Sequence, residues 1–354
     1  MEKTTRPIYF KKPDGEIIEL YQPAFLVGNG INYDENDESS WTSLLISVLP
    51  QDIKEKISNE KEKAVYAKKD EKTKNKEALD KILKGLTYPE IAELADLSEE
   101  KAFSIKRQIA NKINEIDKRN ANNNQIHEKF VGFCKQNHIP ILTTNFDHRL
   151  LSGLGIKKER AYSGQIETPH WFYTEEEKMN PRKISYRYPF RAYFAKERLK
   201  SEEINSEFAI WHIHGTKRYI NSICINNVDY ARNIAEIDKL IRHKNLINEN
   251  NWIGKHSWID IFMKNDLVII GFGLGYAETD IRWLLRERLV YQKFINQQGN
   301  QSRAATIYIY RKGHEDSDMP SGKKEFFDAL DIDVVSMPQE DIYSLDKYLS
   351  THKN

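Results

Sequence analysis

Four short apolar runs, each ended by small or polar residues, dominate the hydrophobic pattern of this chain. They lie at residues 25–32, 139–147, 209–216 and 266–274. Each apolar part is too short for a typical helix and is continuous instead of alternating, which is typical of a strand buried on both faces of a parallel sheet. Polar segments with helical character separate the runs. The pattern therefore predicts an α/β fold with a Rossmann-like parallel sheet.

Glycines and polar side chains gather where these predicted strands end. The first strand runs into Gly28-Asn29-Gly30-Ile31-Asn32. Glycine lets the backbone turn sharply and approach a ligand closely, and a helix that starts there attracts phosphate. Strand-end turns also use glycine for backbone reasons alone. Ligands of open parallel sheets bind outside the carboxyl ends of the strands. The residues expected to contact a nucleotide are Gly28, Asn29, Gly30, Asn32, Thr144, Gly271, Phe272 and Gly273.

A family resemblance rests on four strings at these strand ends: GNGIN followed by SW and LL, TTNFD, HIHG, and IIGFGLGYAETDIRWLL. Together, in this order from residue 24 to about 285, they resemble the SIR2-like (sirtuin-like) domain of bacterial antiphage defence NADases. The apolar run at 305–310 fits the next strand of that family. The resemblance implies one NAD-binding domain over residues 1–354. It also implies an NAD+ glycohydrolase that uses NAD+ as its substrate, releases nicotinamide and depletes NAD in an infected cell.

The resemblance also implies catalytic roles for an asparagine and a histidine, and Asp147 is a third candidate. Asn145 would hold a water or a ribose hydroxyl, and His214 would take a proton, because an imidazole titrates near neutrality. Asp147 would orient ribose hydroxyls or stabilise positive charge. Turn capping is the alternative for Asn145 and Asp147, and a satisfied core histidine is the alternative for His214. We expect His212, on the same strand face as His214, to play a supporting role.

The cysteine content bears on both reaction and metal. Classical deacylating sirtuins carry a zinc module held by four cysteines, whereas this chain has only Cys134 and Cys224. Two cysteines without C-x-x-C spacing cannot build that module, so lysine deacylation is disfavoured. The His212-x-His214 pair has no evident third ligand nearby in sequence, and we expect no metal. Lone, reduced thiols are typical of a cytoplasmic protein.

Residues 51–130 are expected to form a helical insert within the domain. Its segment 85–107 resembles a helix-turn-helix, with Thr87 capping a helix whose first turn contains Pro89 and Glu90. The segment is not basic, unlike most DNA-binding surfaces. A DNA-binding regulator is therefore a third hypothesis, behind the NADase and a non-catalytic module that senses NAD or an ADP-ribose derivative. We expect a structural helical unit.

The gap between the second and third strands holds an aromatic and polar insertion at residues 155–207, expected to cover the nicotinamide end or an oligomer contact. An equal alternative is that its aromatic residues form only a small hydrophobic cluster under a long loop.

The chain carries 54 basic and 53 acidic residues, a net charge of +1, so no global field favours nucleic acid or membranes. No segment is apolar enough to span a membrane, and the start does not read as a signal peptide. The expected partners are further copies of the chain and, by analogy with the family, a HerA-like ATPase.

Overall fold

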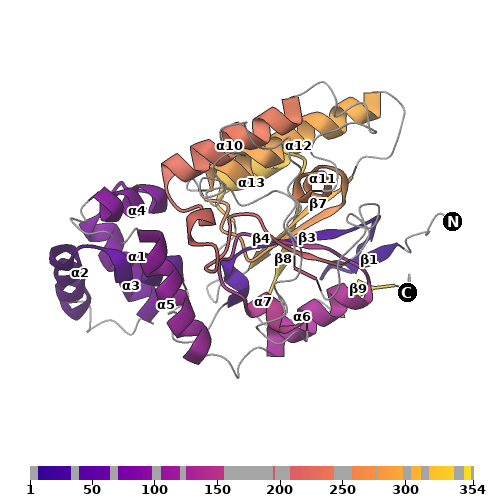
Figure 1. The fold of residues 1–354 in the computed structure, drawn as a ribbon. Helices are drawn as coiled ribbons and strands as arrows, with labels where there is room; N and C mark the ends of the chain where they lie inside the picture. Colours follow the sequence, from indigo (N-terminus) through magenta and orange to yellow (C-terminus); the bar gives the residue numbers. More distant parts are fainter. Residues whose placement is uncertain are drawn as a thin grey trace, which may run out of the picture.

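The computed structural model describes residues 7–32, 40–63, 71–97, 105–119, 125–154, 194–195, 208–242, 257–275, 278–297, 304–311, 319–338 and 347–351. Within these residues the fold is α/β, with a six-stranded parallel sheet of Rossmann-like character (Figure 1). The strand order is β5-β4-β3-β6-β7-β8. The strands are β3 (Ala24–Val27), β4 (Ile141–Thr143), β5 (Ile210–His212), β6 (Leu267–Ile270), β7 (Thr306–Arg311) and β8 (Asp333–Met337). The predicted parallel sheet is confirmed.

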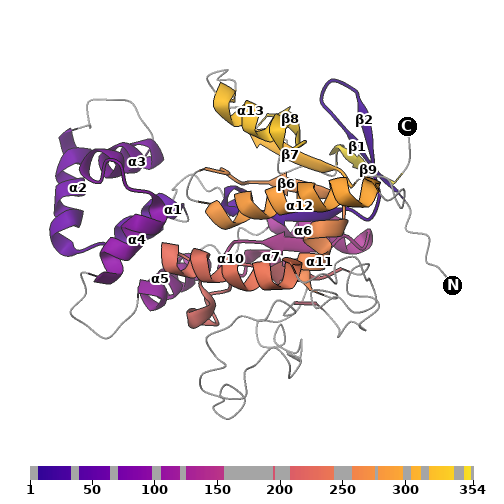
Figure 2. The ribbon, with the colours of Figure 1, turned by 90° about the horizontal axis from the view of Figure 1, so that it is seen from above.

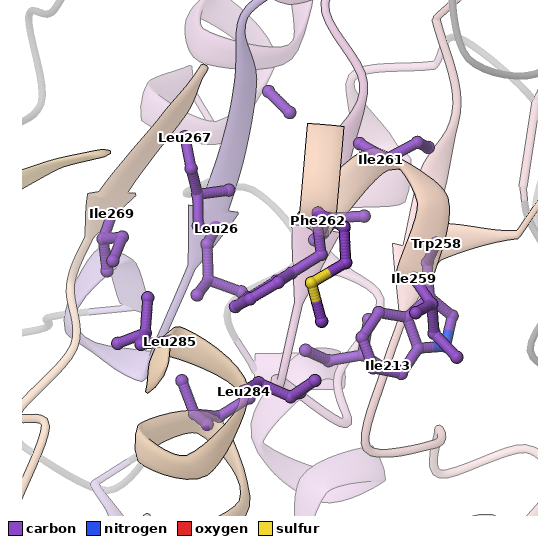
Figure 3. Packing of buried hydrophobic residues seen from close by; sticks show 14 of the residues in the cluster. Leu26, Ile213, Trp258, Ile259, Ile261, Phe262, Leu267, Ile269, Leu284 and Leu285 are labelled. Atoms are coloured by element: carbon purple, nitrogen blue, oxygen red, sulfur yellow. The ribbon is translucent and has the colours of Figure 1, made fainter. Parts of the chain in front are cut away.

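Helices cover both faces of this sheet, which is why its strands read as continuous apolar runs. Leu26 points to one face, where α10 (Asn227–Arg242), α11 (Trp258–Lys264), α12 (Thr279–Gln297) and α13 (Ser321–Ala329) form a core with it. Figure 3 shows this packing, with Phe262 of α11 and Leu284 of α12 close to Leu26. Phe25 and Val27 point to the other face, toward α6 (Gln125–Gln136) and α7 (Arg149–Ser152).

A small antiparallel sheet, which the sequence pattern did not predict, closes the second face. It consists of β1 (Ile8–Lys11), β2 (Ile17–Leu20) and β9 (Leu349–Ser350), with β1 in the middle. Phe10 and Leu20 are fully buried in the same core as Phe25. The strands β1, β2 and β9 lie on the side of the molecule away from helices α2 to α4 (Figure 2).

Five helices between β3 and β4 in the chain form a third core of their own (Figure 2). They are α1 (Trp41–Val48), α2 (Gln51–Lys63), α3 (Glu71–Ile82), α4 (Tyr88–Leu97) and α5 (Ile105–Arg119). Phe146, Ile223 and Ile225, from loops after β4 and β5, pack into this core. Side chains from the carboxyl-end loops of the sheet thus join the helical unit to the sheet.

The helix α4 begins at Tyr88, directly after Thr87, where the sequence predicted a helix start. The Glu90 carboxylate accepts hydrogen bonds from the Thr87 N–H, at 2.6 Å, and from the Thr87 hydroxyl, at 2.8 Å. These bonds lower the pKa of Glu90. The residues of the supposed turn, 98–104, lie outside the described residues, as does nearly all of the aromatic insertion at 155–207. Phe194 of that insertion is described: it is buried and forms an antiparallel bridge with Ile210.

Candidate functional site

The glycine loops after β3 and β6 meet where the strand order of the sheet changes direction. The chain passes from β3 outward to β4 and β5, and then returns to β6 on the other side of β3. The Gly28 N–H donates to the Ile270 carbonyl and the Gly30 N–H donates to the Gly271 carbonyl, each at 2.8 Å. Between β3 and β6 the sheet therefore has a topological switch point, the usual ligand position in open α/β sheets.

Close packing of these loops requires their glycines. A Cβ on Gly28 would lie 2.5 Å from the Gly271 carbonyl oxygen, and a Cβ on Gly30 would lie 2.7 Å from the Gly271 Cα. Gly271 itself has a φ of +66°. The contact between the two loops is thus enough to explain glycine at these three positions. Phe272, another predicted contact residue, packs its side chain in the core.

Asn145 lies in the buried turn after β4, between the β3 loop and the β5 end. Its side-chain N–H donates to the Gly28 carbonyl at 3.3 Å, and its backbone N–H donates to the Thr143 hydroxyl at 3.1 Å. The Asn145 Oδ1 atom is buried without a hydrogen-bond partner among the described residues. A buried amide oxygen without a partner costs free energy, so this atom is suited to accept from a ligand or a water.

Asp147 is held on both carboxylate oxygens. It accepts from the Arg149 N–H at 2.9 Å and from the Asn32 side-chain amide at 2.5 Å. Burial alone would raise the pKa of Asp147, but the Arg149 charge and these hydrogen bonds lower it. The side chain of Asn32 is equally occupied, because it also contacts Asn29 and His127 at 2.9 Å. Among the predicted site residues, Asp147 and Asn32 therefore hold the turns together.

A buried ion network fastens α5 to the same turns. Asp117 of α5 pairs with Arg149 at 3.3 Å and also with Lys217. Burial and the nearby charge of Asp147 raise the pKa of Asp117, while Lys217 and Arg149 oppose that shift. Asn145, Asp147 and Asp117 line a small cavity here, together with Trp41.

His212, for which the sequence predicted a supporting role, contacts the backbone of Asn145. Its Nδ1 lies 2.7 Å from the Asn145 carbonyl oxygen, which can only accept, so Nδ1 carries the proton. Burial lowers the pKa of His212 to about 4. His212 is thus a neutral donor that fixes the Asn145 turn.

His214 pairs with a carboxylate from 66 residues later in the chain. Its Nε2 lies 2.8 Å from Oδ2 of Asp280, in the first turn of α12, and both side chains are buried. Asn233 of α10 donates to the same oxygen at 2.9 Å. With Nε2–H given to the carboxylate, Nδ1 is the nitrogen left to accept a proton.

A cavity of about 360 Å³ opens beside His214. Thr144, Gly273 and Glu278 line it from the strand ends, and Trp41, Tyr88 and Lys76 line it from the helical unit. Its volume lies within the roughly 300–1,000 Å³ of typical small-molecule sites. The structure therefore brings Thr144, His214 and Gly273 together at one cavity, with the β3 loop and Asn145 beside the neighbouring strands.

Two site residues went unnoticed in the sequence. Surrounding protein atoms raise the pKa of Glu278 to about 7, and this carboxyl lines the cavity. Lys323 of α13 donates to the Gly273 carbonyl and lies 3.2 Å from the Tyr308 hydroxyl, and burial lowers its pKa. In the sequence, the only indication for Glu278 was its place two positions before Asp280, in the string ETD. Lys323 carried no such indication, because only the fold brings α13 close to the end of β6.

Cys224 is a third unexpected neighbour. Its Sγ, one imidazole nitrogen of His214 and one carboxylate oxygen of Asp280 all lie within 4.8 Å of one another. The Cys224 N–H donates to the His214 carbonyl at 2.9 Å, which fixes the two residues side by side. Burial and the charge of Asp280 raise the pKa of the Cys224 thiol.

No family model matches the chain, and no curated protein matches it. Among the described residues, no helix is both long and apolar enough to cross a membrane. Function must therefore be argued from the site itself.

Proposed function

We propose that this chain is an NAD+ glycohydrolase with a SIR2-like domain. The observation that carries the proposal is the His214–Asp280 pair beside a cavity at the carboxyl edge of the sheet. One strand away lies Oδ1 of Asn145, which has no hydrogen-bond partner among the described residues. The four ordered strings add the resemblance to defence NADases.

The arrangement suits a dinucleotide that lies across the switch point. The two glycine loops, whose backbones pack on each other at the β3 and β6 ends, would accept the pyrophosphate and adenosine ribose. The cavity would accept the nicotinamide riboside end, which brings the ribose near His214. Gly273, whose carbonyl is fixed by Lys323, would form the border between the two parts.

The chemistry requires a base and a group that positions the nucleophile. The bond from the ribose C1′ to the nicotinamide nitrogen breaks, and its electron pair leaves with neutral nicotinamide. Water adds to the oxocarbenium-like C1′, and its proton passes, directly or through a ribose hydroxyl, to Nδ1 of His214. Asp280 stabilises the imidazolium that results, and Oδ1 of Asn145 holds the water or hydroxyl.

The biological setting is proposed from the resemblance alone. The enzyme would act in the cytoplasm as an effector of antiphage defence, with activity controlled by self-assembly or by a partner such as a HerA-like ATPase. The helical unit would be an insert in the SIR2-like domain, placed where its Trp41 and Tyr88 meet the cavity. Such a position would let assembly or a partner act on the site.

Measuring NAD in infected cells that express the chain tests the proposal. NAD should fall after infection, and nicotinamide and ADP-ribose, linear or cyclic, should rise. The same products should form with purified protein once the activating condition is met. Unchanged NAD in cells that the protein defends would refute the NADase activity. Calorimetric binding of NAD without cleavage in those cells would favour the sensor alternative.

Two variants test the assigned residues. Asn145→Ala should lose at least ~100-fold in rate, typical of removing a positioning or electrostatic group. His214→Ala should lose at least ~100-fold, as expected for a general base. His138→Asn is the matched control, because His138 is exposed and precedes β4 at the opposite edge of the sheet. Near-normal turnover in a folded Asn145→Ala or His214→Ala variant would remove that residue from the mechanism.

A further inference from the structure

We propose that His214, Cys224 and Asp280 bind a zinc-class divalent cation, and that this cation inhibits the enzyme by occupying its base. The three ligand atoms come from three separate chain segments and lie within 4.8 Å of one another, and all three side chains are buried. Imidazole, thiolate and carboxylate are the protein ligands that Zn²⁺ uses. The inhibitory consequence rests on the proposed function, whereas the binding site itself does not.

The geometry needs little adjustment. Ligand atoms around a tetrahedral zinc lie roughly 3.3–3.7 Å apart, given bond lengths of about 2.0–2.3 Å. The His214–Asp280 hydrogen bond, at 2.8 Å, would open slightly and Cys224 would close in. His214 lines the 360 Å³ cavity, so a water can take the fourth position from there.

The scaffold around the three residues is preorganised. The backbone bond from Cys224 to the His214 carbonyl fixes two of the ligands relative to each other. Between them the chain turns tightly at Gly215, which has a φ of +86° and packs against Ser222. Asn233 orients the Asp280 carboxylate at 2.9 Å, as the partners behind metal ligands do.

The charges also favour a cation. A fully buried carboxylate needs compensation, and the hydrogen bonds found for Asp280 come from His214, Asn233 and a backbone N–H, with no lysine or arginine among these donors. A cysteine that binds a metal does so as its thiolate, so binding of a divalent cation at Cys224 should release the thiol proton.

The consequence for catalysis is direct. With the metal on Nε2, the nitrogen that faces Asp280, the single proton of the neutral imidazole lies on Nδ1, so Nδ1 can no longer accept a proton. Asp280, now a metal ligand, also no longer stabilises an imidazolium. The cation would therefore act as a reversible inhibitor, and its removal by a chelator would restore the base.

Cobalt titration of the purified protein tests the site independently of NAD chemistry. Co²⁺ should bind with one-to-one stoichiometry and give a thiolate-to-cobalt charge-transfer band in the near ultraviolet, and Zn²⁺ should displace it. Cys224→Ala should remove the band and weaken binding by at least ~100-fold, since losing even an outer partner of a metal ligand costs about 10–100-fold. Cys134→Ala is the matched control, because Cys134 is the only other cysteine and is buried in α6.

Each outcome decides a separate point. Absence of stoichiometric binding to the wild type, or an unchanged band in Cys224→Ala, would overturn the metal site. Inhibition of NAD cleavage by Zn²⁺ in the wild type and in Cys134→Ala, but not in a folded Cys224→Ala variant, would support the inhibitory role. Cobalt binding that leaves turnover unchanged would overturn that role. Cobalt binding by a protein that never cleaves NAD would instead count against the proposed function and leave the metal site standing.

Discussion

Asp280 decides which nitrogen of His214 is available for chemistry. Because its carboxylate lies 2.8 Å from Nε2, the imidazole presents Nδ1 as its acceptor. Asp280→Asn should therefore lower kcat by at least ~100-fold, within the range for disturbed acid–base catalysis, while KM for NAD changes little. A stopped assay over a range of NAD concentrations separates the two constants. If Asp280 served only to cap α12, the folded variant would keep its kcat and lose only thermal stability.

Gly273 offers a cleaner test of ligand approach than the other glycines. A valine at Gly28 would collide with the Gly271 backbone whether or not NAD binds, so its failure would not distinguish a phosphate site from a structural turn. A Cβ on Gly273 meets nothing nearer than a Glu278 carboxylate oxygen at 4.0 Å, and Gly273 lines the cavity. Gly273→Val should fold normally.

The same variant should bind NAD at least ~10-fold more weakly, because a branched side chain would stand in the space that the ligand takes. Isothermal titration, preceded by a melting curve to confirm folding, is the measurement. Wild-type affinity in a folded Gly273→Val protein would place the nucleotide elsewhere.

At the scale of elements, α4 contains one buried and one exposed apolar residue, and substituting each in turn tests how the helix packs. Ile91 is buried in the core of the helical unit, whereas Leu97, at the end of the same helix, is 87% exposed. Ile91→Asp should cost several kcal/mol, because it buries a charge without a partner. Leu97→Asp should change stability by no more than about 0.5 kcal/mol. Urea unfolding of both variants checks the difference, and equal losses would show that the exposed leucine is covered in solution.

The helix-turn-helix look-alike has two basic residues in the described range 105–119, Lys106 and Arg107, and Lys106 is held in an ion pair. Lys106 of α5 pairs with Asp229 at 2.6 Å, and both side chains are largely buried. A lysine used in this way contributes little to phosphate neutralisation, from which DNA affinity mainly comes. The structural reading of the segment stays a prediction, now supported by the packing of α4 and α5 into one core.

The sheet was readable from sequence because parallel strands leave a strong pattern. Continuous apolar runs that end in glycine, asparagine or histidine placed β3, β4, β5 and β6 correctly, and with them the edge where Asn145 and His214 lie. The strands β1, β2 and β9 escaped notice because short half-buried strands at the ends of a chain carry weak periodicity. Cys224 and Lys323 escaped because their importance depends on contacts across 10 to 50 residues of chain.

At the scale of the whole molecule, buried histidines make stability depend on pH. Burial lowers the pKa of His127 to about 4, of His148 to about 3 and of His212 to about 4. In the unfolded chain a histidine titrates near ~6.5, so below that pH the unfolded state binds protons that the folded state refuses. Glu278 has the opposite effect, because its pKa is about 7 in the folded state and about 4.5 in the unfolded chain. Between these pH values the folded state binds a proton that the unfolded state does not, which offsets the effect of one histidine.

The three histidines less Glu278 leave the unfolded state with about two more bound protons than the folded state, so the free energy of unfolding falls as the pH falls. Each proton contributes about 1.4 kcal/mol per pH unit, so roughly 5 kcal/mol should be lost between pH 6.5 and 4.5. That is comparable with the total stability of many domains, about 5–15 kcal/mol. Calorimetric melting temperatures should fall steeply over this window. A melting temperature that stays constant from pH 6.5 to 4.5 would contradict the neutral buried histidines.

The position of β3 has a consequence for synthesis of the protein on the ribosome. β3 is central, and its neighbour β6 pairs Leu267 with Ala24, more than two hundred residues earlier in the chain. At about 5–20 residues per second, tens of seconds separate the emergence of the two strands. During that time one apolar edge of β3 lacks its partner, and the switch point does not exist. A nascent chain therefore completes the strand-end cluster around His214 only when translation has passed α12, which supplies Asp280.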